Sequence, residues 1–275
     1  MLVDTHCHLN FKRFKDRVEG VIQAAQKAGV SQIIVPGTDV VSSQKAVEIA
    51  RKYEGIHAAV GIHPHHVYEL HGGLIVNSLS QIEELISEPK VVAIGEVGID
   101  RHVYENTKYE KYRVDETFIA LQKELFQEQI KLAIKYKKSL IIHNREAKGD
   151  VTGILRKLWD PLLEGKTVFH CSEPDQELLD FAMEHKMYWG VDGDATYWKE
   201  KQDFIKKVPL SMLVLETDAP FLLPEPLKSQ KLYPNEPKNV PVIAECIAQL
   251  LNQTVENVAS ATTENAKKLF SLESA

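Results

Sequence analysis

Two histidines that lie two residues apart, His6 and His8, follow an apolar start of the chain at residues 1–3. Side chains alternate across an extended strand, so both imidazoles are expected on one side of it, about 7 Å apart at their Cα atoms. Two neutral imidazoles placed in this way can hold one divalent ion. The pair alone is better explained as a polar strand end. A metal site becomes the better interpretation because the pattern of a strand followed by a ligand recurs along the chain.

Further residues that can bind metals follow later apolar runs: His63, His65, Glu96, His143, His170 and Asp218. Each of them alone has an ordinary structural explanation, such as an interior acid paired with a lysine or a buried histidine bonded to backbone. Taken together, four histidines and two carboxylates are too many for one tetrahedral zinc. They suit two cations a few ångströms apart that share a carboxylate. Glu216 alternates with Asp218, and its role stays open.

The elements expected to position these residues alternate along the chain. Eight short runs rich in β-branched residues are predicted as strands, at 1–5, 31–36, 57–62, 90–95, 139–143, 166–170, 187–191 and 212–217. Helical spacing of apolar residues predicts helices at 16–28 and 115–137 and a closing helix at 254–270, with Thr254 as its cap. Eight strands that alternate with helices favour an α/β fold, a closed (β/α)8 TIM barrel forming one domain over 1–275. A doubly wound open sheet stays possible on counting alone.

The C-terminal ends of barrel strands meet at one mouth, so residues far apart in the sequence become neighbours there. Six of the eleven histidines fall at this level of the predicted strands. We therefore expect the metal site at the C-terminal mouth of the barrel. Two loop-rich regions, 97–114 and 219–240, are the candidate rims of that site.

Composition excludes several classes of protein. The formal charge is −6 and there is no long basic block, which counts against a non-specific nucleic-acid binder driven by charge alone. No apolar run reaches the roughly 18 residues of a membrane span, and no secretory signal segment is recognised. Three scattered cysteines argue against a disulfide framework and for a cytoplasmic location.

The motifs, taken in order, resemble those of the TatD-type metal-dependent deoxyribonucleases, a family of amidohydrolase-like barrels. The matching segments are 6–8, 61–65, 94–100, 141–147, 170–171, 216–220 and 262–266. The resemblance therefore runs through nearly the whole chain. As an ordered set these motifs are much more specific for the family than for its substrate.

The resemblance implies two divalent metal ions per chain, of zinc, manganese or magnesium. One ion is expected on His6, His8 and Asp218, and the other on His143 and His170, with Glu96 as the bridge between them.

The resemblance also implies the chemistry. Asp218 is expected to accept the proton of an attacking water, and His63 to orient or protonate the scissile phosphate. Arg145 and His65 are the expected substrate contacts, because the planar fork of an arginine suits phosphate oxygens. The expected substrate is DNA, with RNA as a further one, and the enzyme is expected to act as a monomer.

The chain departs from the family pattern at the expected substrate rim, in segments 101–114, 172–175, 192–194 and 227–231. These differences motivate a second hypothesis, a metal-dependent ester or amide hydrolase such as an aminoacyl-tRNA deacylase, because acids near the mouth repel a phosphate chain. A third hypothesis is a non-catalytic binding barrel with vestigial metal sites. The intact set of metal ligands argues against it.

Overall fold

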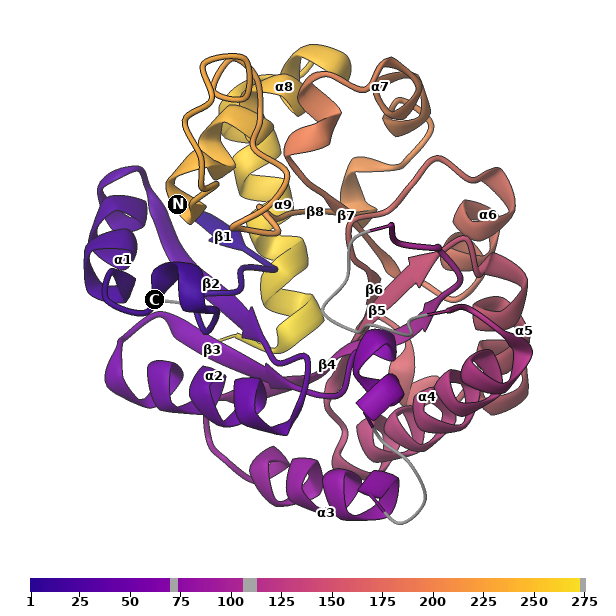
Figure 1. Cartoon of the computed structure of the whole chain (residues 1–275). Helices are drawn as coiled ribbons and strands as arrows, with labels where there is room; N and C mark the ends of the chain where they lie inside the picture. Colours follow the sequence, from indigo (N-terminus) through magenta and orange to yellow (C-terminus); the bar gives the residue numbers. More distant parts are fainter. Residues whose placement is uncertain (70–73, 106–112, 273–275) are drawn as a thin grey trace.

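A computed structural model describes residues 1–69, 74–105 and 113–272 of the chain. Eight strands form one parallel sheet in which sequence neighbours are also neighbours in space (Figure 1). They are β1 (Leu2–Asp4), β2 (Val30–Pro36), β3 (Ile56–Val60), β4 (Val91–Asp100), β5 (Ser139–Arg145), β6 (Thr167–Phe169), β7 (Tyr188–Val191) and β8 (Leu213–Leu215).

The sheet curls until its first and last strands lie side by side. The amide of Thr5 donates to Leu215 O at 3.0 Å, and Cys7 pairs with Ala219 in the parallel sense. The predicted (β/α)8 barrel is therefore confirmed, and the open doubly wound sheet is excluded.

Most of the helices surround the strands on the outside (Figure 1). The helices are α1 (Val18–Lys27), α2 (Val40–Lys52), α3 (Leu74–Ile86), α4 (Glu116–Tyr136), α5 (Lys148–Leu158), α6 (Gln176–Glu184), α7 (Lys199–Ile205), α8 (Val240–Leu250) and α9 (Val255–Phe270). The predicted helices at 16–28, 115–137 and 254–270 correspond to α1, α4 and α9. Thr254 caps α9 as predicted, because its hydroxyl accepts from the amide of Asn257 at 3.1 Å. None of the helices in the described part of the chain has the length and apolar character that crossing a bilayer requires.

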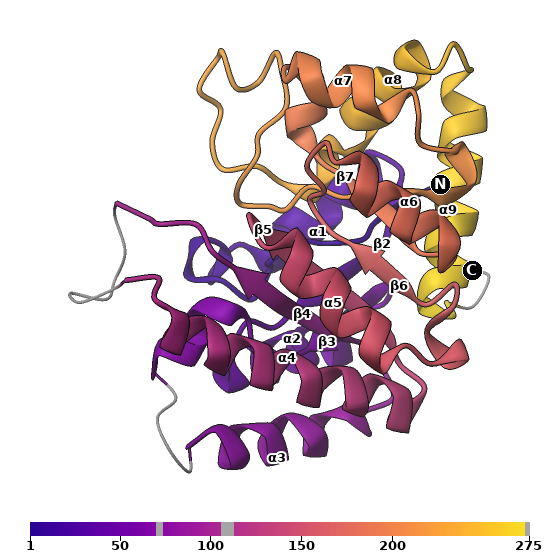
Figure 2. The ribbon, with the colours of Figure 1, turned by 90° about the vertical axis from the view of Figure 1, so that its right-hand side faces the viewer.

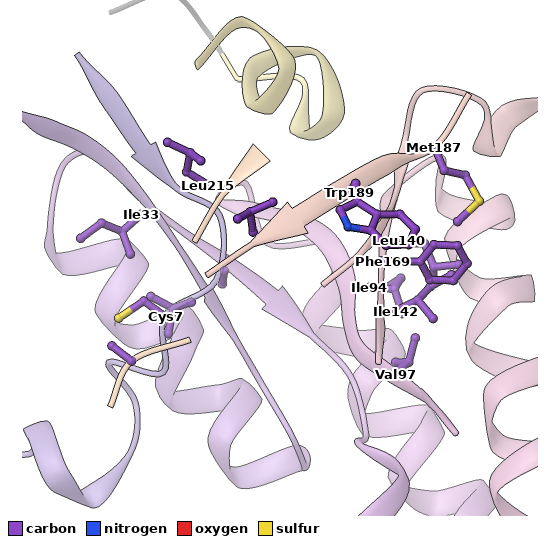
Figure 3. Close-up of a cluster of buried hydrophobic side chains, with 14 of the residues drawn as sticks. Cys7, Ile33, Ile94, Val97, Leu140, Ile142, Phe169, Met187, Trp189 and Leu215 are labelled. Atoms are coloured by element: carbon purple, nitrogen blue, oxygen red, sulfur yellow. The ribbon is translucent and has the colours of Figure 1, made fainter. Parts of the chain in front are cut away.

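Each strand contributes one buried side chain to the interior of the barrel: Val3, Ile34, Ala59, Ala93, Ile141, Val168, Tyr188 and Val214. Ala266, Leu269 and Phe270 of α9 pack against this layer, so α9 closes one end of the barrel. The strand residues that alternate with these point outward and pack against the surrounding helices. Figure 3 shows part of this outer core, which includes Trp189 and Phe169, whose ring centroids are 6.3 Å apart.

The two ends of the barrel differ. In Figure 2 the segments that follow β4 and β8 project on the left, whereas α9 and both chain termini lie on the right. Because all strands run in parallel, the left side is the C-terminal mouth. An active site of a barrel enzyme is expected at this end.

Strand β4 is longer than predicted. It was expected to end at residue 95, with Glu96 just beyond it, but it continues to Asp100, so Glu96 lies inside the strand. Ile94 pairs with Leu140 and Val97 with Ile142, so three steps of β4 oppose two steps of β5. This is a β-bulge, which re-aims side chains locally.

The candidate rims are also more ordered than predicted. The first four residues of the predicted loop 97–114 belong to β4, and 106–112 lie outside the described residues. In the predicted loop 219–240, residues Pro237–Asn239 form a 3-10 helix and α8 begins at Val240. Asn235 fastens this segment, because its side-chain amide donates to Thr217 O at 2.9 Å and to Leu222 O at 3.2 Å.

Candidate metal centre

The ends of β1 and β8 are tied together by a buried carboxylate. Asp4 accepts from the amide of Thr217 at 3.0 Å, from its hydroxyl at 2.6 Å and from the amide of His6 at 3.2 Å. Burial raises the pKa of Asp4 to about 7, against the lowering effect of these hydrogen bonds. This bracing fixes His6 next to Asp218, although the two residues are more than two hundred positions apart.

The first group of candidate ligands comes from the chain just past β1 and β8. The Nε2 atoms of His6 and His8 lie 3.3 Å apart. Asp218 Oδ1 is 3.8 Å from His6 Nε2 and 3.4 Å from His8 Nε2. Glu96 Oε2 completes the group at 3.4 Å and 3.7 Å from the same two nitrogens.

The second group surrounds the other oxygen of Glu96. Oε1 lies 2.9 Å from His143 Nδ1, 2.9 Å from His170 Nε2 and 3.4 Å from His63 Nε2. The ring of His170 stacks on that of His6, with centroids 4.0 Å apart, so the two groups are adjacent. One carboxylate therefore faces two separate clusters of imidazoles, with one oxygen for each.

The donor set fits divalent cations. Cation ligation needs an ionised carboxylate and neutral imidazoles with free lone pairs. Burial alone would raise the pKa of Glu96, but the surrounding histidines hold it well below its ordinary value. Burial lowers the pKa of His6, and lowers that of His63 to about 3, so both rings stay neutral near pH 7.

The carboxylates around His143 and His170 also indicate a cation site, because they favour positive charge there. Burial would lower the pKa of His143, but hydrogen bonds to Asp100 and Glu96 outweigh it and raise the pKa to about 9. The same balance between burial and carboxylates raises the pKa of His170 well above its ordinary value. The carboxylates therefore favour positive charge at this position, as expected of a cation site.

The positions behind two of the imidazoles are taken by acids to which the sequence assigned no role. Asp100 Oδ2 lies 2.9 Å from His143 Nε2, on the side of the ring away from Glu96. Glu216 accepts from the amide of Cys171, and its Oε1 is 3.6 Å from His170 Nδ1. Carboxylates in this position orient a ligating imidazole and fix which nitrogen carries the proton. Asp100 lies in the matching segment 94–100, which was its only signal in the sequence.

The predicted substrate contacts lie on the rim of the same space. A cavity of about 640 Å³ is lined by the candidate ligands other than His6, together with His63, His65, Tyr104 and Arg145. His65 Nε2 is 3.0 Å from Asp100 Oδ2, and Arg145 donates to the hydroxyl of Tyr104 at 3.1 Å. The structure thus brings all the predicted site residues to one mouth.

The two acids of segment 192–194 are partly neutralised. Lys201 of α7 is almost fully buried, and its Nζ lies 3.0 Å from Asp192 Oδ2 and 2.6 Å from Asp194 Oδ1. These carboxylates raise the pKa of Lys201 in spite of its burial, so it stays charged. The repulsion of phosphate that these acids suggested is therefore weaker than the sequence alone indicated.

Comparison with known proteins gives consistent matches along the whole chain. A family model described as TatD related DNase matches residues 3–271. The uncharacterized metal-dependent hydrolase YabD of Bacillus subtilis is 37% identical over 272 residues, which cover 98% of this chain and 99% of that protein. The 3'-5' ssDNA/RNA exonuclease TatD of Edwardsiella piscicida is 31% identical over 276 residues, covering 98% and 100%. The crystal structure of the Escherichia coli TatD homologue YjjV matches with a TM-score of 0.86 at 29% identity, covering 99% and 98%.

Proposed function

From the premise that this chain belongs to the TatD-related DNase family, we propose that it hydrolyses phosphodiester bonds in DNA, and in RNA, with two divalent cations. The observation that carries the proposal is the position of Glu96. Its two oxygens face different groups of histidines, His6 with His8 and His143 with His170. The exonuclease among the relatives supports a nucleic-acid substrate.

The cations would be held by His6, His8 and Asp218 on one side of Glu96 and by His143 and His170 on the other. Zinc, manganese and magnesium are the candidates. Bound there, divalent cations lower the pKa of water and offset the charge that grows on the phosphate. All these residues come from one chain, which supports a monomer as the active unit. The three cysteines are unpaired, which supports a reducing compartment such as the cytoplasm.

The side chains of the protein have separate tasks in this proposal. Asp218 presents Oδ1 to His6 and His8, and its other oxygen accepts the proton of the attacking water. His63 is neutral, and it donates a hydrogen bond to the phosphate from beside Glu96. Arg145, steadied by Tyr104, pairs with a phosphate oxygen.

The test measures cleavage of labelled single-stranded DNA and RNA oligonucleotides and release of the amino acid from a mischarged tRNA, before and after removal of metal by a chelator. We expect chelation to abolish oligonucleotide cleavage and added Mn²⁺, Mg²⁺ or Zn²⁺ to restore it. Asp218→Ala should lower the rate at least about a hundredfold, whereas the exposed acid change Asp203→Ala on α7 should leave it unaltered. Full activity of the Asp218→Ala protein, or hydrolysis of the tRNA ester alone, would overturn the proposal.

A further inference from the structure

A second groove opens beside the metal centre. Its volume is about 940 Å³, and its walls are the 3-10 helix at Lys12–Phe14, the start of α2 and the segment that follows β8. Phe11, Thr38, His66 and Phe221 line both this groove and the cavity of the metal centre. The two spaces are therefore continuous, and a chain held in the metal centre can extend into the groove.

Aromatic rings lead from the metal centre into the groove. The ring of His8 stacks on Phe11 with centroids 4.2 Å apart, and Phe221 meets Phe11 edge to face at 6.3 Å. Phe221 and Tyr233 are 49% and 52% exposed, so their rings are accessible from the groove. Flat exposed rings of this kind are stacking platforms for unpaired bases, because every base has a π-face.

The groove is also basic, in a protein whose formal charge is −6. Lys12, Arg13 and Lys45 line it, and none of them has an ion-pair partner among the residues that the structure describes. The acid in the same wall is Asp39, which caps α2 by accepting from the amide of Ser42 at 2.6 Å.

The opposite flank of the metal cavity is different in charge. Glu173 and Asp194 line it there, on the side of β6 and β7, and Asp194 is paired with Lys201. The charge of Glu173 on that side and three uncompensated cations on the other direct a polyanion toward β1 and β2.

We propose that this groove, lined by Phe11, Lys12, Arg13, Lys45, Phe221 and Tyr233, binds the single-stranded nucleic acid adjoining the scissile phosphate. Bases stack on Phe221 and Tyr233, and the backbone phosphates lie against the three cations. A duplex is excluded from this binding because its base faces are already stacked. The inference rests on the proposed nuclease function, which it deepens by naming the path of the strand.

The experiment compares binding and cleavage of dT12. Binding is measured by fluorescence anisotropy with a hydrolysis-resistant phosphorothioate dT12 in metal-containing buffer. Cleavage is expressed as the ratio of kcat/KM for dT12 to kcat/KM for bis-p-nitrophenyl phosphate, which is small enough to fill the metal cavity alone.

The test variant is Lys12→Gln/Arg13→Gln/Lys45→Gln. The matched control is Lys27→Gln/Lys157→Gln/Lys268→Gln, which removes the same charge from exposed residues in the last turns of α1, α5 and α9.

In the test variant we expect the affinity and the kcat/KM ratio to fall at least about tenfold, and the slope of log K against log salt to fall by roughly 2 for three lost phosphate contacts. The control variant should change each quantity less than about twofold. Tyr233→Ala should weaken binding about tenfold with an unaltered salt slope, because it removes stacking and no charge.

Each other outcome has a definite meaning. If the wild-type protein cleaves dT12 and the test variant behaves like the control variant, the proposed role of the groove is refuted and the proposed nuclease function stands. Binding of dT12 by the groove without any cleavage overturns the nuclease function and leaves the groove standing. Failure of the wild-type protein to bind or cleave dT12 overturns both. Equal affinity for a blunt duplex overturns the stacking role of Phe221 and Tyr233.

Discussion

Replacing Asp100 by asparagine should weaken metal binding although this residue is not among the predicted ligands. Its carboxylate is fully buried. Oδ2 lies 2.9 Å from His143 Nε2, and Oδ1 accepts from the amide of His102 at 2.8 Å. An ionised carboxylate accepts at both oxygens, so when a cation replaces the proton on Nδ1 of His143, Asp100 would keep the other proton on Nε2 and leave the lone pair of Nδ1 for the cation.

An amide has the same shape but only one accepting oxygen. If that oxygen serves His102, the NH2 group of the substituted side chain faces His143 Nε2 and requires it to accept. The proton of His143 then moves to Nδ1, the nitrogen that faces Glu96 Oε1 at 2.9 Å. A protonated Nδ1 has no lone pair for a cation. Changes of this kind cost about 10- to 100-fold in metal affinity or activity, which is about 1.4–2.7 kcal/mol.

The assay is competition for Zn²⁺ or Mn²⁺ against a fluorescent chelator, with oligonucleotide cleavage measured at limiting and at saturating metal. Asp100→Asn should lower the affinity of the weaker metal by about 10- to 100-fold, and excess metal should restore part of the activity. Asp150→Asn is the control, since Asp150 pairs only with the surface cations Arg101 and Lys123 among the described residues. Wild-type metal affinity and activity at limiting metal in the Asp100→Asn protein would refute the reasoning.

Two further predictions concern stability. Burial, together with the positive charge of Lys90, lowers the pKa of His57 to about 4. The folded state therefore loses stability as the pH falls from about 6.5, the pKa of His57 in the unfolded chain, through 4. His57→Gln should remove up to about 3 kcal/mol of this loss. Urea unfolding at pH 7.5 and pH 4.5 tests this, and an unchanged pH dependence would contradict it. Trp189 is fully buried, with ring centroids 6.3 Å from Phe169 and 5.6 Å from Phe204, so Trp189→Ala should cost about 3–5 kcal/mol in the same assay. A loss below about 1 kcal/mol would show that this packing is dispensable.

The strands of the barrel could be predicted because each is a short apolar run, and an apolar run needs no knowledge of distant residues. The length of β4 could not be predicted from its sequence. Gly95 and Gly98 interrupt its apolar pattern and are typical of a strand end. In the structure they belong to the strand because β5 passes so close. A Cβ on Gly98, whose φ is +150°, would lie 1.9 Å from His143 O, and one on Gly95 would lie 2.6 Å from the Cβ of Ile141.

The candidate ligands could be predicted from their level along the strands, since the mouth of a barrel collects them. The charged residues that orient or neutralise these side chains could not be predicted, because each of them acts through a contact between separate elements of the fold. Asp100 of β4 meets His143 of the neighbouring strand β5. Lys201 meets Asp192 and Asp194 from a helix whose exposed and buried sides the sequence alone does not distinguish. Local patterns thus predict which residues reach the mouth, and tertiary packing decides how they are charged and oriented.

The charge at the mouth connects the proposed cations with the proposed role of the basic groove. Four carboxylates, those of Glu96, Asp100, Glu216 and Asp218, meet there around imidazoles of which His6 and His63 are held neutral by burial. Without bound cations the four carboxylates outnumber the positively charged rings of His143 and His170, so the remaining negative charge repels a phosphodiester. Two divalent cations would balance the formal charge of the four carboxylates, which removes the repulsion without creating a strong attraction. Attraction for the strand is then expected from Arg145 at the rim and from the uncompensated positive charge of Lys12, Arg13 and Lys45 in the adjoining groove. Metal should therefore be needed for the strand to reach the site as well as for the chemical step.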